Sequence, residues 1–253
     1  MAGLQFTSRP NRSSIAWLAL LTGLLPFCVV NLSYIGSATG GHIPLCFPYL
    51  QGCTSISAAG RYGLSYFFFK GGMIPAAVVL AAFWVFCRSW LLALGDTDTG
   101  IVRAMVCLGC ISALFLILYT VFLGSRGDFY NLMRRFGVIF YFSFSSLAQL
   151  ILLSRLERLQ RAGRLTLPRY ILRGKFTVMV GLLVLGLGSI PISNFVVDKK
   201  RPENAVEWLF ALLMVSYYFF TWRAWRHTET SLDVTVTDPR AHESSGADEA
   251  PKS

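Results

Sequence analysis

Charged residues are scarce in this 253-residue chain, where Asp, Glu, Lys and Arg together make up 14% against 54% hydrophobic residues. A soluble domain is usually about one quarter charged, so the composition excludes an ordinary soluble domain. Apolar runs of about 20 residues recur instead, and each is long enough to cross a hydrocarbon core of roughly 30 Å. We therefore expect a polytopic membrane protein.

Histidine is also scarce, with three residues, of which His227 and His242 lie at or in the C-terminal tail. The sequence has no HExxH, no nucleophile elbow and no P-loop. A metal site or a catalytic triad would have to form around His42, so no metal and no cofactor are expected. An enzyme would need a base and a nucleophile within reach of each other. The only reasonable candidates are His42, Asp128, Glu207, Ser55 and Ser57.

Six apolar runs predict an all-α fold, a six-helix transmembrane bundle. The runs are continuous rather than alternating, which favours helices over a barrel, the other fold that satisfies its backbone groups in lipid. Their expected bounds are about residues 15–35, 73–94, 101–123, 136–154, 176–197 and 205–222. The membrane domain would then cover residues 15–226, after a cytoplasmic N-terminal segment of residues 1–14.

The distribution of basic residues predicts that both termini face the cytoplasm. In this orientation the cytoplasmic segments hold 15 Lys and Arg residues and the opposite side holds 8, in agreement with the positive-inside rule. The connection between the fourth and fifth spans dominates this count, since residues 155–175 carry seven basic residues and one acid. This cluster could also attract anionic lipid headgroups or a protein partner, although topology alone explains it.

The C-terminal tail has a different composition. Residues 227–253 carry two basic and six acidic residues and no Phe, Tyr or Trp. Such a segment cannot bury enough apolar surface to fold. We therefore expect a disordered, acidic, cytoplasmic tail.

The first connection on the non-cytoplasmic side is unusually long, from Gly36 to about Gly72. Its prolines and glycines favour a compact cap over a free tether. Cys46 and Cys53 could form a disulfide there in an oxidising compartment. The alternative is two unpaired cysteines at the membrane edge.

Several ionisable residues share the side of this connection and could form a headgroup site. A carboxylate at the membrane edge is costly and often functional, and arginine can hold a phosphate with forked hydrogen bonds. The candidate ligand-binding residues are Arg61, Asp128, Arg134, Arg135 and Glu207. The alternative is ordinary snorkelling and structural ion pairs.

Four segments, in this order, resemble the FRAG/DRAM/SFK family of six-span membrane proteins. Pro48-Tyr49-Leu50 and SISAA at residues 55–59 resemble elements of the family's first lumenal loop. Residues 127–147 resemble the entry to the fourth span, and Glu207-Trp208 resembles the start of the last span. There are two departures. Arg134 and Arg135 occupy the region where members often have a histidine, and Gln51-Gly52 replaces a Ser-Asp.

The resemblance implies a role in lipid handling. Members, including the post-GPI-attachment Golgi branch and the damage-regulated autophagy modulators, are linked to GPI-lipid remodelling, phospholipid organisation and autophagy. The leading hypothesis is a non-enzymatic protein of an endomembrane (Golgi, ER or lysosome) or of the plasma membrane that engages membrane lipid on its non-cytoplasmic face. A lipid acyl-transfer or hydrolytic enzyme is the alternative. A transporter is a further one, disfavoured by the near absence of charge in mid-span. No nucleic-acid partner is expected.

Overall fold

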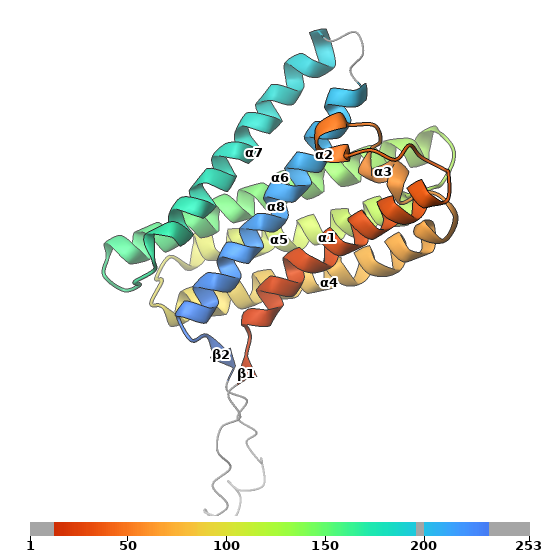
Figure 1. Ribbon diagram of the computed structural model, residues 1–253. Helices are drawn as coiled ribbons and strands as arrows, with labels where there is room; N and C mark the ends of the chain where they lie inside the picture. Colours follow the sequence, from red (N-terminus) through yellow and green to blue (C-terminus); the bar gives the residue numbers. More distant parts are fainter. Residues whose placement is uncertain (1–12, 196–199, 233–253) are drawn as a thin grey trace, which may run out of the picture.

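The computed structural model describes residues 13–195 and 200–232, which are almost entirely helical. Six long helices dominate: α1 (Ala16–Thr39), α4 (Gly63–Ala93), α5 (Thr99–Phe122), α6 (Asp128–Arg161), α7 (Arg169–Phe195) and α8 (Lys200–His227) (Figure 1). Two short helices, α2 (Pro48–Gln51) and α3 (Ile56–Ala59), lie in the first long connection. The two-residue strands β1 (Ser13–Ser14) and β2 (Ser231–Leu232) pair antiparallel.

The predicted fold class is confirmed, because all six long helices are long and apolar enough to cross a membrane. The helices extend beyond the predicted spans. Helix α4 begins at Gly63 rather than near residue 73, and α6 continues to Arg161 rather than ending near residue 154. Hydropathy detects only the apolar part of a helix, whereas helical hydrogen bonding continues into the polar turns at both ends.

The connections alternate between two ends of the bundle. One end, which we call the lid end, carries α2 and α3, the turn between α5 and α6, and the start of α8 (Figure 1). The other, which we call the terminal end, carries the β1–β2 pair (Figure 1). The predicted N-terminal segment lies outside the described residues up to residue 12, and the predicted disordered tail does so from residue 233 onward. Before that point, α8 continues to His227 and Leu232 pairs with Ser13.

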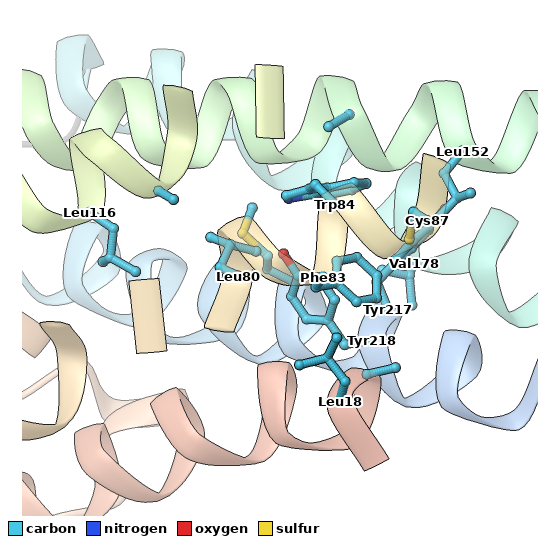
Figure 2. Close-up of a cluster of buried hydrophobic side chains, with 14 of the residues drawn as sticks. Leu18, Leu80, Phe83, Trp84, Cys87, Leu116, Leu152, Val178, Tyr217 and Tyr218 are labelled. Carbon is cyan, nitrogen blue, oxygen red and sulfur yellow. The ribbon is translucent and has the colours of Figure 1, made fainter. Parts of the chain in front are cut away.

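Close packing of large aromatic side chains forms the core of the bundle. Phe83 and Trp84 of α4 and Tyr217 and Tyr218 of α8 are all at least 99% buried (Figure 2). The rings of Phe83 and Tyr218 meet edge-on, with centroids 5.1 Å apart. Lipid tails are as apolar as the side chains, so association of membrane helices depends on such packing contacts rather than on a hydrophobic driving force.

Helix α7 packs closely on α8 and only loosely on α6. Gly174 and Gly181 lie on the α8-facing side of α7, and a Cβ at Gly181 would come within 2.9 Å of the Leu213 Cδ1 atom. Small residues at such positions allow two helix backbones to approach closely. Helix α7 therefore follows α8 and diverges from α6 with distance from the turn that joins them (Figure 1).

A buried ion pair fixes the terminal end. Arg155 of α6 donates from Nε to Asp96 Oδ2 at 2.8 Å, from Nη2 to Asp96 Oδ1, and from Nη1 to Asp98 Oδ2 at 3.2 Å. The Asp96 side chain has no exposed surface. Burial acts to raise the pKa of Asp96, but the hydrogen bonds from Arg155 and the Asp98 backbone, together with the charges of Arg155 and Arg158, outweigh burial and hold this pKa below its usual range.

Lys175 lies inside the bundle and not, as predicted, in a polar connection at its surface. Its side chain is fully buried, its Nζ donates to Thr221 Oγ1 at 2.6 Å, and its Nζ lies 3.5 Å from the centroid of the Tyr217 ring. The connection between α6 and α7 is shorter than the sequence predicts, because α7 already begins at Arg169. Lys175 thus helps to hold α7 on α8.

Candidate functional site

A cavity of about 1780 Å³ lies between α6, α7 and α8. It forms where α7 diverges from α6, and α8 supplies its inner wall. At the lid end, Ser55 and Ser57 at the start of α3 and Arg61 just after α3 also line it. The packing preference of α7 for α8 is thus the structural origin of the cavity.

The part of the cavity away from the lid is mainly apolar and open to the side of the bundle. Leu150 of α6 is 49% exposed, and Phe176 and Leu183 of α7 are 57% and 61% exposed. In a membrane these side chains would face the hydrocarbon core. Acyl chains could therefore enter the cavity laterally.

Three arginines line the lid end of the cavity: Arg61, Arg134 and Arg135. In the described part of the chain, no carboxylate lies within 4.0 Å of any of their guanidinium groups. Among the residues that the structure describes, the Arg134 side chain donates only to Asn131 Oδ1, at 3.1 Å, and the buried Nε of Arg61 has no hydrogen-bond partner. The charges of Arg61 and Arg134 also repel each other. This arrangement is unfavourable when empty and favours the binding of an anion.

Glu207 of α8 connects the cavity to the lid. Its partly buried carboxylate is hydrogen-bonded to the backbone of Ile56 and Ser57 at the start of α3, and it interacts with the charge of Arg61. Glu207 also lines a second, mainly apolar cavity of about 50 Å³, together with Tyr119 and Trp208. A volume of this size holds one or a few water molecules at most.

The lid, residues 40–62, is fixed on the bundle by contacts with α1 and α8. Cys46 and Cys53 form a disulfide within it. Trp208 Nε1 donates to the Thr54 carbonyl oxygen at 2.9 Å. On the other side, Tyr34 Oη of α1 accepts from the Cys46 N–H at 2.7 Å and donates to the Cys46 carbonyl oxygen at 2.6 Å. The lid is thus a compact cap over the ends of α1 and α8.

Gly52 allows the lid to approach α8 closely. It adopts a left-handed conformation with φ of 55°, and its Cα lies so close to the Arg201 carbonyl that a Cβ would overlap it. Its carbonyl oxygen accepts from Asn204 Nδ2 at 2.9 Å. Gly52 therefore anchors α2 to the start of α8.

The structure brings four of the predicted ligand-binding residues to this one cavity: Arg61, Arg134, Arg135 and Glu207. Asp128 does not line it, because this residue lies in the exposed first turn of α6. Asp128 therefore lies at the same end of the bundle as the other four residues but outside the cavity lining.

The candidate catalytic residues come together only in part: Ser55, Ser57 and Glu207 line the cavity, whereas His42 and Asp128 do not. His42 is exposed and stacks on Tyr62, with ring centroids 5.4 Å apart. Within the described ranges, no hydrogen bond joins His42 to a carboxylate or a serine, and no three His, Cys, Asp or Glu side chains are grouped to hold a metal ion. Ser57 instead shares a 3.0 Å hydrogen bond with Tyr119, and Ser55 caps α3 by accepting from the Ala58 N–H.

Sequence reasoning missed Glu203, which also lines the cavity. The signal was available, because Glu203 precedes Glu207 by four positions and residues at this spacing share one face of a helix. Glu203 lies in the first turn of α8, ahead of the predicted span, so hydropathy placed it in a connection.

Comparisons of this chain with protein-family models, with curated proteins and with solved structures found no match.

Proposed function

We propose that this integral membrane protein binds a phospholipid in the cavity between α6, α7 and α8. The phosphate would lie at the arginines of the lid end, and the acyl chains would follow the apolar walls. The observation that carries the proposal is the combination of Arg61, Arg134 and Arg135, which lack carboxylate partners in the described residues, with an apolar cavity that opens sideways. A hydrogen bond to a charged group contributes about 1.5–3 kcal/mol, so two or three of them would hold a phosphate firmly.

Two further observations support a choice of leaflet. The distribution of basic residues predicts that the lid end lies on the non-cytoplasmic side. The lid contains the Cys46–Cys53 disulfide, and disulfides persist in oxidising compartments. Both support a lipid of the lumenal or outer leaflet, with the chain termini in the cytoplasm.

The resemblance to the FRAG/DRAM/SFK family supports a role in lipid organisation, GPI-lipid remodelling or autophagy-linked membrane regulation. A glycosylphosphatidylinositol lipid carries the same phosphate as other phospholipids and would use the same arginines. We propose an accessory, non-enzymatic role in an endomembrane or the plasma membrane. Protein partners would bind through the basic connection between α6 and α7 or through the acidic tail.

Native mass spectrometry of the purified protein with added phosphatidylglycerol tests the proposal. The variant Arg61→Ala/Arg134→Ala/Arg135→Ala should lose at least about tenfold in lipid affinity, because tenfold corresponds to about 1.4 kcal/mol, less than one charged hydrogen bond. Circular dichroism and size-exclusion chromatography would show that the variant is folded.

A matched control variant is Arg126→Ala/Lys200→Ala/Arg201→Ala. These three residues are exposed at the same end of the bundle and do not line the cavity. The control removes the same positive charge, and we expect it to bind phosphatidylglycerol within about twofold of the original chain. Equal losses in the two variants, or unchanged binding in the cavity variant, would rule out the proposed headgroup site.

A further inference from the structure

The polar end of the cavity has two walls of opposite charge. The lid and α6 contribute Arg61, Arg134 and Arg135, and α8 contributes Glu203 and Glu207. Among the described residues, no ion pair within 4.0 Å joins the two walls. Each wall therefore presents its charge to the cavity.

The acidic wall is unfavourable without a cation. Glu203 and Glu207 are four positions apart on α8, and like charges at this spacing repel each other. Glu207 is partly compensated by the backbone of Ile56 and Ser57 and by the charge of Arg61. The Glu203 carboxylate has neither a hydrogen bond nor an ion pair with any residue in the ranges 13–195 and 200–232.

A purely anionic headgroup would satisfy the basic wall of this site but not the acidic wall. Its phosphate would neutralise the arginines, but it would add negative charge in front of two carboxylates. A headgroup with a phosphate and an adjacent cation satisfies both walls at once. The phosphate would bind the Arg wall of α6, and the cation would bind the Glu wall of α8.

The chemistry of the acidic wall selects the kind of cation. A primary ammonium has three N–H donors for carboxylate oxygens, whereas a quaternary ammonium has none. Quaternary ammonium groups are bound by aromatic cages, built best from Trp and Tyr. Neither residue type lines this cavity in the described part of the chain. The site therefore fits an ammonium that can donate hydrogen bonds.

We infer that the ligand of the cavity is a zwitterionic phospholipid whose headgroup carries a primary ammonium beside the phosphate, as in phosphatidylethanolamine. This inference rests on the proposed function, because it uses the same cavity and the same arginines. It adds the substrate class and assigns Glu203 and Glu207 as the residues that select it.

Competition by native mass spectrometry tests the inference, with phosphatidylethanolamine, phosphatidylcholine and phosphatidylglycerol of identical acyl chains. The original chain should bind phosphatidylethanolamine at least about tenfold more tightly than the other two. In Glu203→Gln and in Glu207→Gln the preference over phosphatidylglycerol should fall by at least about fivefold, while phosphatidylglycerol itself binds no more weakly. Gln keeps the shape and a hydrogen-bonding oxygen, so the connection of Glu207 with α3 is retained.

Asp128→Asn is the matched control, because it removes one negative charge from an exposed site at the same end. Its preference should equal that of the original chain. Equal affinity for the three lipids, or an unchanged preference in both Glu variants, would overturn the inference and leave phosphate binding in place. Failure of the proposed function has a different signature, since phospholipid binding would then be unaffected by the triple Arg variant.

Discussion

Replacing Arg155 with methionine should cost about 3–5 kcal/mol of unfolding free energy, because it leaves a buried carboxylate without its partner. The Asp96 side chain has no exposed surface and receives two hydrogen bonds from Arg155. Asp98 contributes less, since its side chain is 35% exposed and water can replace the arginine there.

The same helix offers a control for this substitution. Arg161 pairs with Glu157 across one turn of α6, at 3.4 Å, but the Arg161 side chain is 82% exposed. Arg161→Met should therefore cost only about 0.5 kcal/mol or less. Both variants remove one arginine from the terminal end, so the difference between them isolates burial.

Reversible unfolding in mixed detergent micelles, followed by tryptophan fluorescence, measures both variants. In the double variant Arg155→Met/Asp96→Asn much of the loss should be recovered, because no unpaired charge remains buried. If Arg155→Met costs no more than Arg161→Met, the ion pair does not stabilise the terminal end and our account of it is wrong.

Three further predictions follow from single contacts. Because the pKa of Asp96 is lower in the folded than in the unfolded chain, ionised Asp96 stabilises the fold above the usual Asp pKa of about 3.9. This stabilisation is lost as the pH falls through the pKa of Asp96 in the folded state. Melting temperature should therefore decrease below about pH 4, and this decrease should be smaller in Asp96→Asn; an equal decrease in both proteins would contradict the pairing. Thr221→Val removes the hydrogen-bond acceptor of the buried Lys175 and should lower the unfolding free energy by about 1–3 kcal/mol in detergent, so unchanged stability would argue against this bond. Trp208→Phe leaves the Thr54 carbonyl without its donor, and faster hydrogen exchange in residues 40–62 is expected; unchanged exchange would mean that other contacts fix the lid.

The six helices were predictable because each contains a long apolar run, and lipid allows few other structures for such runs. The end of the bundle to which Arg61, Arg134, Arg135 and Glu207 belong also followed from counting spans. However, the end of the bundle at which a residue lies does not determine whether its side chain lines the cavity. Asp128 is at the expected end, yet it lies in the exposed first turn of α6 and does not line the cavity.

The cavity could not be predicted, because it depends on whether α7 packs against α6 or against α8. Gly174 and Gly181 indicate a close helix contact, but their spacing does not identify α8 as the partner. Lys175 was assigned to a polar connection since hydropathy treats lysine as a surface residue. In the structure Thr221 and the ring of Tyr217, both distant in sequence, compensate its burial.

The most direct test of the central claim is a structure of the full chain in lipid nanodiscs that contain phosphatidylethanolamine. We predict density for one lipid between α6 and α7, with its phosphate within hydrogen-bond distance of Arg134 or Arg61 and its ammonium toward Glu203. A cavity filled only by water, or closed by movement of α7 onto α6, would contradict the account.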